Sequence, residues 1–424
     1  MQIRCAGFYL AGAAAARTGD EMSGPALLLA GFAVSGSVTE ASSLLAAVTA
    51  AAAVGGPVLG AFLDRSARPG RLLAGALALY GAGLVLILAA LGRLPFAFVL
   101  AIAVGTGLSG PALSGGWTAQ LPRVVPPERL PRATALDAMT FSAAGLAGPA
   151  LAGTAAGLLG APAAVGLSVV LIGAGLPVAW GLPGRVAGVR RDREALPQEA
   201  TAHPDPDPKK PRGTRGTVIG DLAAGVRCIV RSPSLARATL TSVASCAAQG
   251  MLVTCTPLLG ARSLGGAGHG ARLLSGIAVA SLVANAALAR FPGRLAPDTV
   301  VRTGALIQAA ALALAATGRP ALLATAVLLA GAGEGPQLTA LFALRHREAP
   351  EWLRSQVFVT GASLKITGFA LGAAVAGPMI GRSLPGTLLT AAGVQAVGAL
   401  GGAARRKGTL AAARPFSKQG GTDT

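Results

Sequence analysis

The sequence has few charged residues for its length. Only 12% of its 424 residues are Asp, Glu, Lys or Arg, whereas 52% are hydrophobic. A soluble protein of this length could not cover its surface with so few charges. The composition therefore excludes a soluble globular protein and indicates a chain that crosses a membrane many times.

Side chains suited to catalysis or metal binding are also scarce. The chain has three histidines and four cysteines, and their spacing is not that of a metal site or a CxxC motif. His203, His269 and His346 fall in the predicted loops, and no histidine has a candidate nucleophile beside it. We therefore expect reduced thiols, no metal, no cofactor and no enzymatic activity.

Long apolar runs are abundant. Each has about the 20 residues that a helix needs to cross a bilayer, and the 60 glycines are typical of membrane helices that pack through small residues. We predict an all-α membrane protein with an uncleaved first span. The twelve predicted spans are residues 8–34, 41–63, 72–92, 95–120, 138–158, 162–183, 236–259, 271–289, 298–317, 320–344, 356–380 and 384–403.

The net charge of +19 is distributed in a pattern. The arginines and lysines gather in alternate predicted loops, as orientation signals do, rather than along one face. This asymmetry predicts that both termini lie in the cytoplasm. It also predicts anionic lipid headgroups, rather than nucleic acid, as the neighbours of these residues.

Short motifs recur in order along the chain. Gly110-Pro111 is repeated as Gly335-Pro336, and Gly148-Pro149 as Gly377-Pro378. The recurrence favours two duplicated six-span halves. The predicted parts are an N-terminal half (1–183), a basic, proline-rich cytoplasmic linker (184–216), a C-terminal half that begins with an amphipathic helix (217–404), and a disordered cytoplasmic tail (405–424).

A short basic segment lies between the second and third apolar runs. It contains Gly60, Asp64, Arg65, Arg68 and Arg71. These residues resemble the loop signature of the major facilitator superfamily. The resemblance implies twelve helices in two pseudo-symmetric halves and transport by alternating access. It also implies that this segment governs conformational switching, with the aspartate and its neighbouring arginine holding helix ends together in one state.

The second half departs from this signature, because Ala289 replaces the aspartate. Any corresponding contact there should be weaker.

A second resemblance lies in the fifth predicted span. Ala144, Gly148-Pro149 and Ala152-Gly153 are similar to the exporter signature of proton antiporters, with two glycines replaced by alanine. Proline within a span permits a bend, and Gly377-Pro378 repeats the feature. The alternative is an ordinary packing face of small residues. The arginine that such antiporters carry in the fourth span is missing from this sequence.

Charged residues inside spans are the sharpest functional signal. Each costs about 2.5–3.5 kcal/mol near the bilayer centre, so it normally faces a cavity or a partner. We predict that Asp20 or Glu334 carries the coupling proton. The alternative is two structural pairs, Arg17 with Glu21 and Glu334 with Lys365. The predicted cavity residues are Arg17, Asp20, Glu21, Glu334, Gln337 and Lys365.

These observations predict a proton-coupled exporter of a small organic molecule, acting as a monomer in a bacterial inner membrane. An importer of a sugar or metabolite is the alternative within transport. A non-transporting membrane sensor or an intramembrane enzyme is the alternative from another class. The fold does not specify the substrate.

Overall fold

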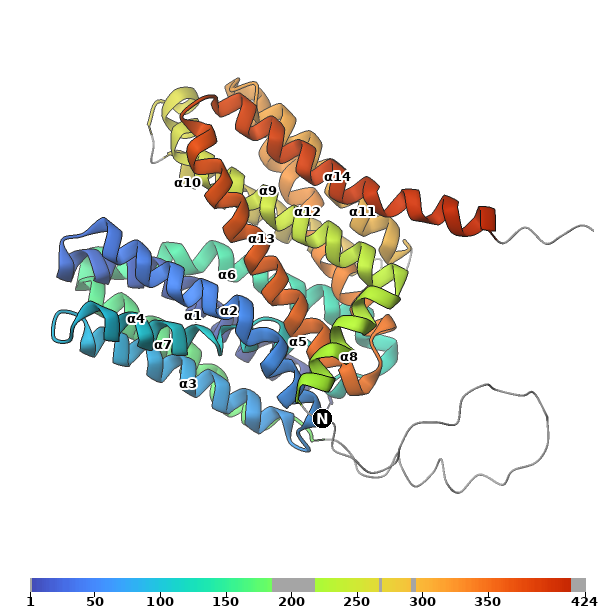
Figure 1. Ribbon diagram of the computed structural model, residues 1–424, viewed down its shortest axis with the longest axis horizontal. Helices are drawn as coiled ribbons and strands as arrows, with labels where there is room; N and C mark the ends of the chain where they lie inside the picture. The colour runs from blue at the N-terminus through green and yellow to red at the C-terminus, as the bar shows by residue number, and fades with distance from the viewer. Residues whose placement is uncertain (1, 185–217, 267–268, 291–294, 413–424) are drawn as a thin grey trace, which may run out of the picture. The chain divides into compact units, whose positions relative to one another are not determined.

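A computed structural model describes residues 2–184, 218–266, 269–290 and 295–412 (Figure 1). The predicted linker lies outside the described residues except for Gly184. The predicted tail is helical as far as Ala412, and residues 413–424 lie outside the described residues.

The described residues are almost entirely helical, as the apolar runs predict. Among the described residues, seven α-helices precede the linker: α1 (Gln2–Ser35), α2 (Val38–Arg65), α3 (Pro69–Ala90), α4 (Phe96–Gly107), α5 (Gly115–Thr118), α6 (Leu130–Leu159) and α7 (Ala161–Trp180). Seven described α-helices follow the linker: α8 (Val218–Arg231), α9 (Pro233–Leu264), α10 (His269–Arg290), α11 (Pro297–Ala315), α12 (Pro320–Glu348), α13 (Arg354–Ile380) and α14 (Leu384–Ala412).

Eleven of the described helical segments are long and apolar enough to cross a membrane. Helix α1 has 34 residues but is not among the eleven, and it carries Arg17, Asp20 and Glu21 in its middle. An all-α membrane fold is therefore confirmed, while the twelfth span stays a prediction.

Several predicted boundaries were wrong. The segment 60–71 is mostly helical rather than a loop, because α2 continues to Arg65 and α3 begins at Pro69. Proline suits the first turn of a helix because its missing N–H would be unpaired there anyway. Helix α10 begins at His269 and α12 continues to Glu348, so His269 and His346 lie in helices and not in loops.

The fourth span is interrupted. Helix α4 ends at Gly107, and a 3-10 turn (Gly110–Ala112) separates it from α5. Pro111 within that turn has no N–H to donate to the preceding helical turn. Pro149 and Pro378, in contrast, lie inside continuous helices.

The chain forms two compact units that do not follow the two halves of the sequence. Unit 1 consists of Met1–Leu130, Gly148–Cys228 and Ala349–Ser363, and unit 2 of Pro131–Ala147, Ile229–Glu348 and Leu364–Thr424. Helices α6 and α13 therefore each contribute to both units.

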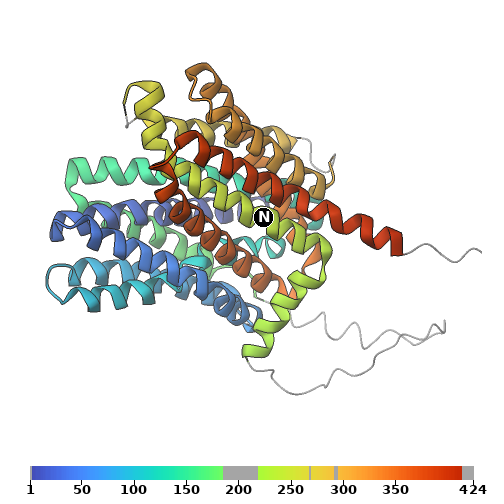
Figure 2. The same ribbon diagram turned by 45° about the horizontal axis from the view of Figure 1, so that its top comes forward.

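Each unit has its own helix contacts. In unit 1, α1 and α3 pack along α7, and α2 packs along α4. In unit 2, α10 and α11 pack on α12. Helix α14 (red) lies along α9 (yellow-green) in Figure 1 and Figure 2. Part of the unit 2 core is a cluster of small and aliphatic side chains that includes Met251, Cys255 and Leu388.

Candidate functional site

Charged and polar side chains of α1 meet the third and fourth spans inside unit 1. Arg17 is only 2% exposed, and its Nη2 donates to Thr118 Oγ1 at 2.8 Å. Asp20 interacts with Tyr80 of α3, whose hydroxyl lies 2.9 Å from Ser23 Oγ. We call Arg17, Asp20, Ser23, Tyr80 and Thr118 the α1 cluster. It places a carboxylate beside a phenol and a buried guanidinium.

Two charges act on the Asp20 carboxylate within unit 1. Arg17 attracts its negative charge, and Glu21 on the same helix repels it. The Asp20 side chain is partly exposed and the Glu21 side chain is exposed. An acid between a cation and another acid responds strongly to changes in either neighbour. This arrangement suits a group that gains and loses a proton.

The glycine of the predicted exporter signature lies directly against this part of α1. A Cβ on Gly148 would lie 2.7 Å from Glu21 Cβ and 2.9 Å from Met22 N. Only glycine therefore allows α6 to approach α1 so closely, one residue after Asp20. Its counterpart Gly377 has no neighbouring atom within 4 Å of a Cβ. The two motifs share a sequence but have different surroundings.

This difference predicts opposite effects for one substitution at two positions. Gly148→Ala forces a methyl group into the α6–α1 contact and should destabilise the protein by about 1–3 kcal/mol. Gly377→Ala meets open space and should be neutral or stabilise by up to about 1 kcal/mol, because alanine is the better helix former. Thermal unfolding of the purified variants measures both. Equal effects at the two positions would contradict a special role for the Gly148 contact.

Asp64 lies at the end of α2, where its carboxylate reaches the start of α13 within unit 1. Its Oδ1 accepts from the Ser355 N–H at 3.0 Å and its Oδ2 from the Gln356 N–H at 2.8 Å. The first N–H groups of a helix have no partner within the helix and carry partial positive charge. Asp64 therefore caps α13 from another helix, and this polar contact is buried.

Gly60 makes this capping contact possible. A Cβ at Gly60 would lie 2.6 Å from Gln356 Cα, so glycine lets α2 cross the start of α13. About two turns from this crossing on each helix, Ser363 Oγ of α13 donates to the Ala52 carbonyl of α2 at 2.7 Å. The structure thus brings together Gly60 and Asp64 of the predicted switching segment, with α13 as their partner.

The arginines of the segment face outward. Arg65, Arg68 and Arg71 are exposed. The Arg71 guanidinium lies 5.0 Å from the ring centroid of Trp180, at the end of α7. Tryptophan and arginine are typical of the interface between hydrocarbon and headgroups.

The predicted residues of the second half meet α9 in unit 2. Gln249 Nε2 donates to Glu334 Oε1 at 3.1 Å, and Gln337 Nε2 donates to Ser245 Oγ at 2.9 Å. Lys365 stabilises the negative charge of Glu334 electrostatically. The direct polar partner of Glu334 is thus Gln249, and Lys365 contributes through its charge.

Amide side chains that the sequence analysis did not select extend this contact. Gln308 Nε2 of α11 donates to Gln337 Oε1 at 2.6 Å, and Gln395 Nε2 of α14 donates to Ser245 Oγ at 2.9 Å. Gln337 therefore ties helices together and is only 6% exposed. The sequence signal that could have identified Gln308 and Gln395 is a polar amide within an apolar run, because burying an amide without a hydrogen bond is costly.

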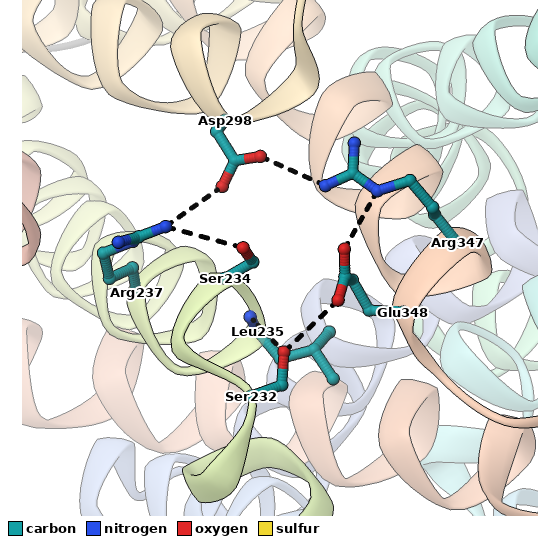
Figure 3. Close-up of polar contacts among 7 residues, drawn as sticks. All are labelled: Ser232, Ser234, Leu235, Arg237, Asp298, Arg347 and Glu348. Atoms are coloured by element: carbon teal, nitrogen blue, oxygen red, sulfur yellow. Dashed lines mark hydrogen bonds and ion pairs between the residues drawn. The ribbon is translucent and has the colours of Figure 1, made fainter. Parts of the chain in front are cut away.

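A second polar group joins the ends of α9, α11 and α12 in unit 2 (Figure 3). Asp298 lies 3.7 Å from Arg237 and 3.2 Å from Arg347, and Arg347 Nε donates to Glu348 Oε1 at 2.9 Å. Ser232 caps α9 through the Leu235 N–H and donates to Glu348. Such partly exposed ion pairs are worth up to about 1 kcal/mol each, so this group orients helix ends.

Comparison with known proteins then decides the family. Residues 9–376 match the Major Facilitator Superfamily. The chain belongs to the major facilitator superfamily. The predictions of this family, and of a transporter rather than an enzyme, are confirmed.

Relatives and solved structures of the superfamily agree with this assignment. An MFS-type transporter of Sinorhizobium fredii, y4rN, is 28% identical over 309 residues, which cover 70% of this chain and 69% of the relative. The human organic anion transporter MFSD10 has a TM-score of 0.72 at 17% identity, covering 94% of this chain and 99% of that one. The E. coli fucose:proton symporter FucP has a TM-score of 0.64 at 16% identity, covering 95% and 97%. These structures share the fold.

Proposed function

We propose that this transporter exports a small organic molecule in exchange for protons by alternating access. The observation that carries the proposal is the contact of Gly148 with α1 beside Asp20. Gly148, one of the residues that resemble an exporter signature, thereby lies against Glu21, the residue that follows Asp20 on α1, and Glu21 repels the charge of the Asp20 carboxylate. A shift of α6 against α1 at this contact would move the neighbour of Asp20 and so change the environment of the proposed proton-binding group.

Coupling needs an acid whose proton affinity differs between the two conformations of the carrier. Water around a carboxylate, a nearby cation and hydrogen-bond donors all favour its ionised form, whereas a dry site disfavours it. Asp20 is partly exposed and has Arg17, Glu21 and Tyr80 around it. Movement of any of these groups during transport changes its affinity for a proton.

We assign the coupling role to Asp20 rather than Glu334. Lys365 and Gln249 both stabilise the ionised Glu334 in place. The guanidinium near Asp20 is shared, because Arg17 also binds Thr118. The remaining predicted cavity residues, Glu21, Gln337 and Lys365, then act in positioning and charge balance.

The fold itself does not set the direction of transport, since a fucose:proton symporter shares it. Export is supported by the signature around Gly148 and by the scarcity of polar, sugar-binding side chains in the spans. Import of a sugar or metabolite is the outcome that the experiment must distinguish.

The test uses inside-out vesicles that contain the transporter and have an acidic interior, with a pH-sensitive dye and a panel of organic compounds. An exported compound enters these vesicles as protons leave, so its addition should dissipate the pH gradient. Vesicles without the protein provide the baseline. Uptake that is driven by the opposite gradient, or that ignores pH, would contradict proton-coupled export.

The proposed setting is a bacterial inner membrane with the α2–α3 connection and both termini in the cytoplasm. On a background without native cysteines, a membrane-impermeant thiol reagent added to intact cells should label Ser37→Cys, between α1 and α2. It should not label Ala67→Cys, between α2 and α3, until the cells are broken open. Labelling in the reverse pattern would invert the proposed topology.

A further inference from the structure

Unit 1 has a lateral groove of about 500 Å³ that the proposed transport mechanism does not use. Helices α2 and α3 pack far more extensively on α4 than on each other, which leaves a furrow between them. Its lining is almost wholly apolar and includes Val54, Val58, Phe62, Leu72, Leu79 and Leu108. Most of these side chains are exposed at the protein surface.

The length of the groove fits one leaflet of a bilayer. The α2 residues that line it run from Val54 to Phe62, which corresponds to about 12 Å at roughly 1.5 Å per helical residue. Half of a hydrocarbon core about 30 Å thick is about 15 Å. A groove of this length that opens to the membrane fits an acyl chain that lies along the helices.

Two arginines lie at the end of the groove nearest the α2–α3 connection. Arg65 follows Val58 and Phe62 at helical spacing on α2, and Arg68 precedes Leu72 by one turn at the start of α3. Both side chains are exposed. The acid of this connection, Asp64, is buried and accepts from the backbone of α13. Positive charge therefore dominates where a lipid headgroup would sit.

Trp180 marks the same level in the membrane. It lies at the end of α7 under the Arg71 guanidinium, and tryptophan is enriched at the headgroup level. The apolar groove thus ends at the depth where phosphate groups lie.

We propose that this groove is a binding site for an anionic glycerophospholipid. One acyl chain lies between α2 and α3, and the phosphate lies between Arg65 and Arg68. Arginine matches phosphate through several donors in a planar array. The proposal does not rest on the direction or the coupling of transport proposed above, although Arg65 and Arg68 belong to the segment 60–71.

The test titrates the purified, full-length protein in detergent with phosphatidylglycerol or with phosphatidylcholine of identical acyl chains, and counts bound lipids by native mass spectrometry. We expect phosphatidylglycerol to bind about 25-fold more tightly, about fivefold from each arginine. The double variant Arg65→Gln/Arg68→Gln should abolish this preference.

Gly75→Phe tests the acyl-chain part of the site. Gly75 lines the groove, and no atom lies within 4 Å of a Cβ there, so a larger side chain has room to begin and we expect its ring to occupy the groove. This variant should lose both lipids at concentrations that saturate the wild type. The matched control is Gly166→Phe on α7, an exposed glycine that also has open space and lies outside the groove. It should bind both lipids normally.

Either of two results would overturn the proposal. Equal binding of the two lipids to the wild type would show that Arg65 and Arg68 do not form a headgroup site, and the groove would then bind only neutral apolar molecules. Normal binding to Gly75→Phe would mean that the arginines attract lipid at the surface without the groove.

Discussion

Asp20→Asn should abolish transport driven by a pH gradient and leave equilibrium exchange of substrate intact. Asparagine preserves the size of the side chain and its ability to bond with Tyr80 but cannot bind and release a proton. Accumulation should fall to the level of vesicles without protein, the largest effect that we expect of any substitution. Labelled substrate, followed with and without an imposed pH gradient, measures both activities in one preparation.

Glu334→Gln is the matched control for Asp20→Asn. It removes the other acid that we predicted as a coupling group but retains an acceptor for Gln249, so we expect accumulation to survive. If both variants still concentrate substrate against its gradient, neither acid is the coupling group. If only Glu334→Gln loses accumulation, the roles that we assign to the two acids are exchanged.

Asp64→Asn should slow transport about tenfold to a hundredfold without reducing the amount of protein in the membrane. The carboxylate accepts two hydrogen bonds from the start of α13. Asparagine has one oxygen, so its amide must turn a donor towards one of these N–H groups. Hydrogen bonds to charged groups are worth about 1.5–3 kcal/mol, and losing that from one conformation shifts the equilibrium between conformations by the same amount.

Initial transport rates and membrane content together measure this effect, because the arginines that orient the connection remain in place. Asp298→Asn is a suitable comparison, since its carboxylate also bridges helix ends but its side chain is 38% exposed. That variant should change transport little. Normal transport by Asp64→Asn would reduce the segment 60–71 to a topology signal.

The fold was largely predictable because apolar runs of membrane length have few other uses. The errors lie at helix ends, where the hydropathy of the sequence falls several residues before the helix ends. Helix α12 illustrates this, since Arg345 lies in it and is only 2% exposed. Hydropathy measures transfer to lipid, whereas a helix continues as long as its backbone hydrogen bonds and packing persist.

The candidate site was predictable in part. Charges inside apolar runs identified Asp20 and Glu334, but their partners Tyr80 and Gln249 come from other helices, and no periodicity in one segment reports such contacts. The paired Gly-Pro motifs show the same limit. Gly148 and Gly377 are equivalent in sequence, and only the structure reveals that one is packed and the other is not.

The division of α6 and α13 between the units bears on how the chain can be cut. A fragment that ends within the linker would lack residues 349–363, to which Asp64 binds. The complementary fragment would lack residues 131–147, where Phe141 packs against Phe342 and Ser142 bonds with Ser281. Each of these segments would then be on a different fragment from the rest of the unit that it packs into. A gene split at the linker should therefore yield a working carrier only when both products are made in the same cell.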